Sequence, residues 1–129
     1  QIMDNRLYAV RGAVCCENTC ESILAQVPQM YRELLEKNAI LEDDIVSVMF
    51  TVTTDLTALN PATALRKAGF AKSVALFAAA EPCIENSLPR VIRALVTYYG
   101  SKKPVPVYLN GAEALRPDLG SAARSGSGN

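Results

Sequence analysis

The chain has 129 residues, of which 50% are hydrophobic and 20% charged, and its 13 basic side chains balance 13 acidic ones. A chain of this length forms one domain that buries about two thirds of its unfolded surface. Balanced charge excludes a general attraction to nucleic acid or to an anionic membrane, and no apolar run reaches the roughly 20 residues of a membrane span. We therefore expect a cytoplasmic protein with no nucleic-acid or membrane partner.

The first predicted strand runs from Leu7 to Val14 and carries one charged residue, Arg11. Side chains alternate between the two faces of a strand, so Arg11 shares its face with Ala9 and Ala13. These small neighbours leave room around the guanidinium. Alone, Arg11 would be interpreted as an exposed residue near a strand end.

A long amphipathic helix is predicted next. Asn18 and Glu21 have the spacing of a capping box, and apolar residues recur at three- and four-residue intervals from Ile23 to Leu35. The nearly continuous apolar run over 45–53 predicts a strand inside a sheet.

A polar loop then leads to Asn60 and Pro61, and proline suits the first turn of a short helix from Ala62 to Lys67 that carries Arg66. The segment 73–78 predicts a third strand, followed by Glu81. A strand over 91–98 and a final strand over 105–109 complete the pattern. Pro106 places the last of these at a sheet edge.

The strand over 91–98 is apolar except for Arg93 in its middle. Arg93 shares its face with Val91 and Leu95. A guanidinium on an apolar face is costly unless an anion meets it. Two interpretations follow from the residues alone: an internal ion pair with Glu81 or Glu85, or an anionic ligand.

Five strands, one long helix and one short helix predict an α+β domain, with the helices on one face of a mixed five-stranded sheet. We expect the domain to cover residues 3–119. The segment 120–129 is rich in small residues and is expected to be a mobile C-terminal tail.

The composition also limits the chemistry. The chain has no histidine, and the spacing of Cys15, Cys16, Cys20 and Cys83 does not match a zinc site, so we expect reduced thiols and no metal or cofactor. No nucleophile with an adjacent base is evident. The remaining candidates are the guanidinium groups of Arg11, Arg66, Arg93 and Arg116, which together suit a small dicarboxylate, with Tyr108 beside them. Glu81 would then accept a hydrogen bond from a hydroxyl group.

Four segments together resemble the AroH-class, or Bacillus-type, chorismate mutases, in one register from about Arg6 to Leu119. The segments are Val10-Arg11-Gly12-Ala13; Asp55-Leu56 through Pro61-Ala62 to Leu65-Arg66; Glu81 with Arg93 twelve residues on; and Val107-Tyr108-Leu109 followed by Ala114-Leu115-Arg116-Pro117-Asp118-Leu119. The resemblance implies a homotrimer with a barrel-like core and active sites at subunit interfaces. The implied reaction is the rearrangement of chorismate to prephenate in aromatic amino-acid biosynthesis, without a cofactor.

The resemblance also implies residue roles. Arg93 would donate to the ether oxygen and to the side-chain carboxylate of the substrate, Arg11 and Tyr108 would hold that carboxylate, and Glu81 would accept from the ring hydroxyl. Arg66 of a neighbouring subunit and Arg116 would lie near the pocket mouth, with Leu115 beside Arg116. Under these roles the anionic ligand is favoured over the internal ion pair as the partner of Arg93.

Two substrate-binding positions depart from the family pattern. Asn60 stands where the family often has an aromatic residue, and Ala78 stands where cysteine is common. We expect weaker substrate affinity from both changes. Two alternatives remain beside the mutase: a trimeric imine or enamine deaminase-like enzyme, and a non-catalytic sensor of aromatic-pathway metabolites.

Overall fold

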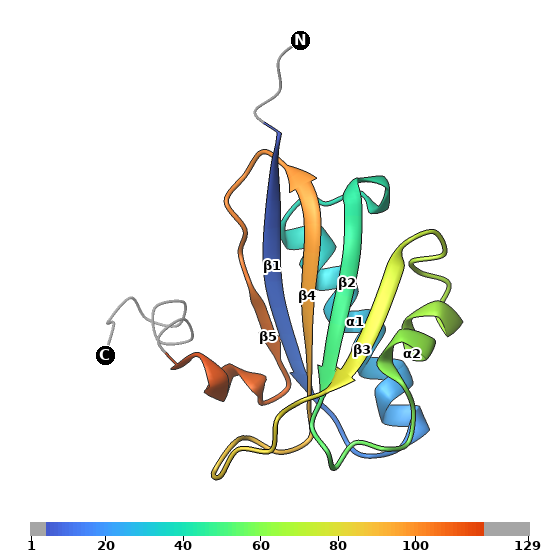
Figure 1. The fold of residues 1–129 in the computed structure, drawn as a ribbon, viewed down its shortest axis with the longest axis vertical. Helices are drawn as coiled ribbons and strands as arrows, with labels where there is room; N and C mark the ends of the chain where they lie inside the picture. Colours follow the sequence, from blue (N-terminus) through green and yellow to red (C-terminus); the bar gives the residue numbers. More distant parts are fainter. Residues whose placement is uncertain (1–4, 118–129) are drawn as a thin grey trace.

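The computed structural model describes residues 5–117 and forms one five-stranded sheet covered by two α-helices (Figure 1). The strands are β1 (Arg6–Cys15), β2 (Ile45–Val52), β3 (Ala75–Ala80), β4 (Val91–Gly100) and β5 (Val107–Leu109). The α-helices are α1 (Cys20–Lys37) and α2 (Pro61–Lys67). Two 3₁₀ helices are also present: η1 (Glu42–Asp44) precedes β2, and η2 (Ala112–Leu115) follows β5. The predicted tail 120–129 lies outside the described residues.

The strand order is β3-β2-β4-β1-β5, which places β4 at the centre and β5 at an edge. β4 is antiparallel to both β1 and β2, whereas β1 pairs with β5, and β2 with β3, in parallel. The parallel pair β2 and β3 is joined through α2, as a crossover connection requires. The predicted mixed sheet and the edge position of the last strand are confirmed.

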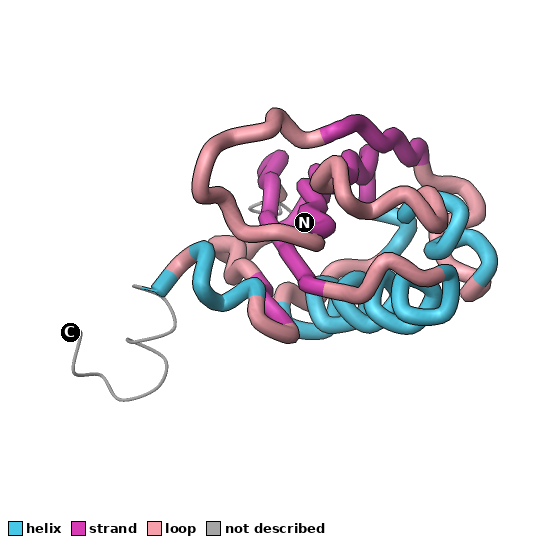
Figure 2. The backbone as a smooth tube through the Cα atoms, turned by 90° about the horizontal axis from the view of Figure 1, so that it is seen from below, coloured by secondary structure: helices cyan, strands magenta, loops and turns pink. Residues whose placement is uncertain are grey.

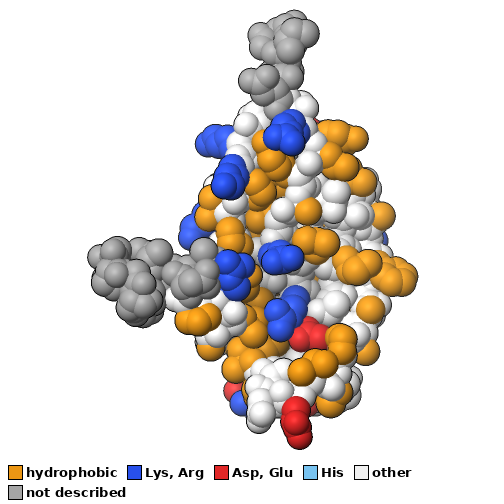
Figure 3. All heavy atoms as spheres, turned by 60° about the vertical axis from the view of Figure 1, so that its left-hand side comes forward, with side chains coloured by type: hydrophobic (Ala, Val, Ile, Leu, Met, Phe, Trp, Pro, Cys, Tyr) orange, Lys and Arg blue, Asp and Glu red, His pale blue; other side chains and the backbone are white. Residues whose placement is uncertain are grey.

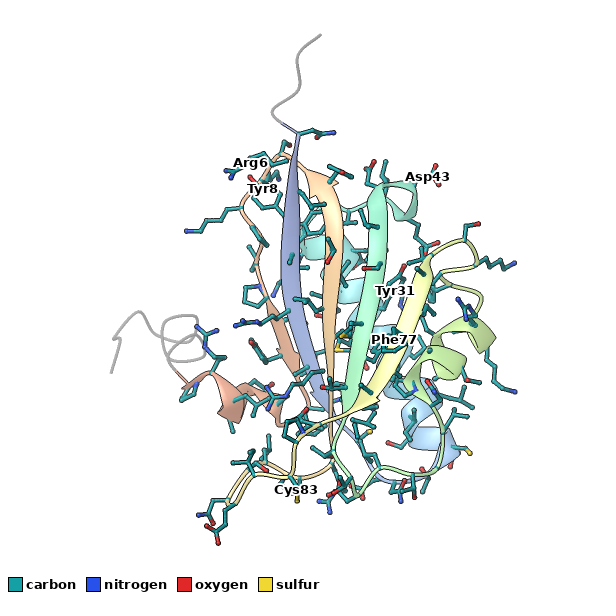
Figure 4. All side chains as sticks on the ribbon, in the orientation of Figure 1. Arg6, Tyr8, Tyr31, Asp43, Phe77 and Cys83 are labelled. Carbon is teal, nitrogen blue, oxygen red and sulfur yellow. The ribbon has the colours of Figure 1, made fainter. Side chains whose placement is uncertain are left out.

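Both α-helices cover the same face of the sheet (Figure 2), and the main core lies between them and the strands. Val10, Val48, Phe50 and Val96 point from the sheet into this core, as alternation along each strand requires. Tyr31 of α1, labelled in Figure 4, is fully buried, and its hydroxyl donates to Glu42. Among the described residues, no helix is long and apolar enough to cross a membrane.

Gly12 allows α1 to pack closely on β1. A Cβ at Gly12 would lie 2.7 Å from Cδ1 of Leu34 and 3.3 Å from Cγ of Met30, and both of those side chains are fully buried. We therefore expect Gly12→Ala to lower the free energy of unfolding by about 1–3 kcal/mol through overpacking. Urea unfolding at a fixed protein concentration measures the change.

A double-mutant comparison controls the Gly12 prediction. In a Leu34→Ala background the obstructing side chain is gone, so Gly12→Ala is expected to cost less there than in the parent protein. Equal costs in the two backgrounds would show that contact with Leu34 is not the cause.

Several predicted element boundaries need correction. The N-cap of α1 is Thr19, whose hydroxyl accepts from the Ser22 N–H at 3.0 Å, and not Asn18. Asn18 instead binds the loop before α2, because its Oδ1 accepts from the N–H groups of Thr57 and Ala58. β3 begins two residues later than predicted, and β5 begins after Pro106.

The face of the sheet opposite the helices is partly apolar and exposed. Phe77 of β3, labelled in Figure 4, is 64% exposed. Four further exposed side chains point the same way by alternation along their strands: Leu7, Met49, Leu95 and Tyr99. We call this surface the open face; it also carries Arg11 and Arg93.

Candidate active site

A pocket of about 250 Å³ lies on the open face between β1, β4 and η2. Five of the predicted site residues line it: Arg11, Arg93, Tyr108, Leu115 and Arg116. Figure 3, which views this side of the molecule, shows Lys and Arg side chains grouped among hydrophobic ones, with an acidic side chain next to them. The pocket thus combines positive charge with apolar walls.

The pairing of β1 with β4 brings Arg11 and Arg93 together. Arg11 lies opposite Leu95, and Ala13 lies opposite Arg93, so the two arginines are diagonal neighbours on the open face. Ala9 and Ala13, which flank Arg11 on its face, add little bulk, as the strand pattern predicted. Two guanidinium groups at diagonally neighbouring positions can hold one carboxylate between them.

Arg93 forms an ion pair inside the protein. Its Nε donates to Oε1 of Glu81 at 2.9 Å, with the side chains 42% and 13% exposed respectively. The internal ion pair, which the resemblance had disfavoured, is therefore present, and Glu81 is the partner. The two interpretations are compatible in space, because Arg93 also lines the pocket. Because the Glu81 contact uses Nε, the Nη groups of Arg93 stay available to a ligand, so the two interpretations are not exclusive.

Thr51 is a pocket residue that the sequence reasoning missed. It lines the pocket, and its hydroxyl donates to Oε1 of Glu81 at 2.9 Å. The same carboxylate oxygen therefore accepts from both Thr51 and Arg93. A threonine in an apolar strand gives no signal of this role on its own, since threonine is common in strands.

A tight turn after β5 carries η2 back over the sheet and places Leu115 and Arg116 at the pocket. Asn110 and Gly111 both have positive φ, 53° and 100°, a backbone conformation that glycine and asparagine tolerate best. The Asn110 side chain donates to Gln26 of α1, which ties the turn to the helix layer. Tyr108 precedes this turn and pairs with Ala13 of β1.

Asp55, part of the segment that carries the family resemblance, has a structural contact. Both of its carboxylate oxygens accept from the Arg90 N–H at 3.1 Å, and Arg90 has a positive φ of 54°. This contact supports Arg90, the strained residue that immediately precedes β4. It thereby helps to fix the start of the strand that carries Arg93.

Three predicted substrate-binding residues do not reach this pocket within one chain. Asn60 caps α2 and lines a separate hollow together with Ala78, which packs against the main core on the helix side. Arg66, on α2, donates from Nη2 to the Val74 carbonyl at 3.2 Å. Within residues 5–117, the pocket lining therefore comes from β1, β2, β4, β5, η2 and Arg116 just after η2.

Cys15 and Cys16 are not activated as nucleophiles. Burial raises the pKa of Cys16 to about 11, and burial with the nearby Glu113 carboxylate also raises the pKa of Cys15. Both thiols therefore stay protonated at neutral pH, whereas a nucleophilic cysteine needs a lowered pKa. Within residues 5–117, no group of three or more Cys, Asp or Glu side chains lies together as a metal site would require.

The geometry suits the binding and electrostatic stabilisation of an anion. Two arginines and a tyrosine offer forked and single donors to carboxylate groups, and Arg93 also offers a cationic donor to any oxygen that gains charge. Glu81 beside Arg93 supplies a hydrogen-bond acceptor. Reactions that need only orientation and charge stabilisation could proceed in such a pocket.

Comparisons with known proteins identify the family to which the chain is similar. The family model described as "Chorismate mutase type I" matches residues 7–119. The chain is 41% identical to "Chorismate mutase AroH" of Thermus thermophilus, over 88% of this chain and 96% of that protein. It is 32% identical to "Chorismate mutase AroH" of Bacillus subtilis, over 88% of this chain and 92% of that protein.

A solved structure is similar as well. A chorismate mutase from Clostridium thermocellum superposes with a TM-score of 0.79 at 40% identity, covering 83% of this chain and 98% of the other. The resemblance inferred from the four sequence segments is confirmed by the sequence and by the fold. The chain belongs to the type I chorismate mutase family.

Proposed function

We propose that this protein catalyses the rearrangement of chorismate to prephenate, a step in aromatic amino-acid biosynthesis. The observation that carries the proposal is the convergence of Arg11, Arg93 and Tyr108 on one pocket in a chain of this family. Chorismate is a small dicarboxylate, so a pocket of about 250 Å³ with several cationic donors suits its size and charge.

The chemistry fits the side chains that are present. The reaction is a [3,3] rearrangement within one molecule: the C–O bond of the ether breaks while a C–C bond forms, and no proton moves. Catalysis then needs two effects. One is to hold the flexible enolpyruvyl arm over the ring, which can contribute several kcal/mol. The other is to stabilise the negative charge that develops on the ether oxygen, where one positioned donor is worth about 3–4 kcal/mol.

In this proposal Arg93 donates to the ether oxygen and to the side-chain carboxylate. Arg11 and Tyr108 hold the same carboxylate, and Leu115 with Arg116 forms the wall near the mouth. Glu81 accepts from the ring hydroxyl. The contact between Arg93 and Glu81 uses Nε and Oε1, so the Nη groups of Arg93 and Oε2 of Glu81 are the atoms that would meet the substrate.

The proposed active form is a homotrimer in which the open faces of three sheets meet. The exposed apolar residues Phe77, Met49 and Leu95 on that face support an interface there, since side chains of this size are usually buried. Asn60, Arg66 and Ala78 lie away from the pocket within one chain, so the substrate-binding roles proposed for them require a second copy.

Sedimentation at micromolar concentration tests the oligomeric state. The expected result is a single species of three times the 13.9 kDa chain mass. A compact monomer that still turns over chorismate would overturn the shared site, because Arg66 could not then take part.

An assay with purified protein tests the activity. Chorismate consumption is followed by loss of its diene absorbance, and an α-imino acid is offered separately. Turnover of chorismate alone, inhibited by an oxabicyclic mimic of the transition state, supports the mutase. Turnover of the imino acid would support a deaminase-like enzyme, and binding of chorismate without turnover would support a sensor; either result contradicts the proposal.

We further propose that the functional domain spans residues 3–119, supported by the family match over residues 7–119. A cytoplasmic location is proposed as well. It is supported by the thiol form of Cys15, Cys16, Cys20 and Cys83, since reduced thiols are typical of that compartment.

A further inference from the structure

We propose that Thr51 is a positioning residue for the reaction. In this proposal its hydroxyl holds the Glu81 carboxylate against Arg93 and thereby sets the direction in which the Arg93 guanidinium meets the substrate. The inference rests on the proposed mutase activity, but its geometric part can be tested without substrate.

The β2–β4 register puts Thr51 directly opposite Arg93, and both side chains lie on the open face. Oγ1 of Thr51 and Nε of Arg93 both donate to Oε1 of Glu81, each at 2.9 Å. One carboxylate oxygen thus accepts hydrogen bonds from side chains on two adjacent strands, β2 and β4. Thr51 and Arg93 also line the pocket itself, so two members of this three-residue network form part of its wall.

The backbone around the network is held in place independently. The Glu81 N–H donates to the Val52 carbonyl at 2.8 Å, which fixes the chain just beyond the end of β3. The Thr53 N–H donates to the Val91 carbonyl at 3.1 Å, which closes the ladder between β2 and β4. What remains adjustable is the Glu81 side chain, which has three rotatable bonds, and the hydroxyl of Thr51 is the neutral donor that holds it.

Fixing the Glu81 carboxylate also orients the Arg93 guanidinium. A guanidinium is planar, so an acceptor at Nε fixes the plane in which both Nη groups lie. The Arg93 side chain is 42% exposed and is therefore not oriented by burial alone. A shift of about 1 Å in a catalytic group can cost roughly hundredfold in rate. A smaller loss of orientation should appear in kcat, because the contact to the ether oxygen strengthens only in the transition state.

The variants Thr51→Val and Thr51→Ser separate the hydroxyl from the shape of the side chain. We expect Thr51→Val to lower kcat for chorismate by about tenfold with KM changed less than about threefold, and Thr51→Ser to keep kcat within about threefold of the parent. Thr97→Val is the matched control, because Thr97 lies on the same face of β4 but outside the pocket lining; its kcat should be unchanged. If Thr51→Val does not fold, Thr51→Ala takes its place with the same expected loss.

A second measurement uses no substrate. In ¹⁵N NMR spectra, the Arg93 Nε–H signal, assigned by its loss in Arg93→Lys, should be protected from solvent exchange in the parent and in Thr51→Ser but exchange faster in Thr51→Val. A kcat for Thr51→Val within about twofold of the parent would overturn the proposal. So would unchanged Nε–H exchange, or an equal kcat loss in Thr51→Ser. If the parent protein does not turn over chorismate, the proposed function fails, and the exchange measurement still decides whether Thr51 orients Arg93.

Discussion

Arg93→Ala is expected to lower kcat for chorismate by about hundredfold or more. Arg93 is the cationic side chain at the centre of the sheet that both lines the pocket and is oriented by a carboxylate. It is also the group proposed to meet the charge that develops on the ether oxygen. Removing it takes away an interaction that is stronger in the transition state than in the bound substrate, so the loss should fall on kcat as well as on kcat/KM.

Two variants control this prediction. Arg93→Lys keeps the charge but loses the planar fork and the Nε contact to Glu81, so most of the loss should persist. Arg6→Ala removes an arginine at the far end of β1, where Arg6 lies over the Tyr8 ring, and should leave kcat unchanged. Steady-state kinetics on all three variants provides the measurement. A kcat for Arg93→Ala within about threefold of the parent would contradict the role assigned to this residue.

Strand periodicity was enough to predict part of this site. Alternation placed Arg11 with Ala9 and Ala13, and placed Arg93 with Leu95, on single faces of two strands, and the structure agrees. Alternation could not show that these strands are neighbours. The proximity of Arg11 to Arg93 comes from the antiparallel register of β1 with β4, which joins residues about eighty positions apart in the chain.

The network around Glu81 could not be predicted from sequence for a different reason. Glu81 follows β3, Thr51 lies on β2 and Arg93 lies on β4, and these three strands are adjacent only in the folded sheet. The order β3-β2-β4 results from one parallel and one antiparallel pairing, which local propensity does not specify. The family resemblance supplied the residue roles but not the contact between Arg93 and Glu81.

The N-terminus of α1 shows how two local signals can compete. Asn18 and Thr19 are both good capping residues, and Glu21 completed a capping box with Asn18. The structure uses Thr19 as the cap because Asn18 is engaged with the N–H groups of Thr57 and Ala58. A tertiary contact of this kind ties α1 to the loop before α2 and has no counterpart in local sequence.

Glu81→Ala is expected to lower kcat/KM by roughly ten- to hundredfold, since a hydrogen bond to a charged group is worth about 1.5–3 kcal/mol. Two causes could produce this loss. Glu81 is proposed to accept from the ring hydroxyl of the substrate, and it orients Arg93 through Nε. A chorismate analogue without the ring hydroxyl separates them. If orientation of Arg93 contributes, Glu81→Ala still lowers turnover of the analogue; if turnover of the analogue is unaffected, Glu81 acts only as the hydroxyl acceptor.

The double variant Glu81→Ala with Thr51→Val extends this test to the whole network. In the described structure, the hydrogen bonds that link the Thr51 side chain to Arg93 pass through the Glu81 carboxylate. Once that carboxylate is gone, loss of the Thr51 hydroxyl should have no further effect on kcat, so the two single effects should not add. Independent, additive losses would mean that Thr51 does not act through the Glu81 carboxylate, which would contradict the proposed network.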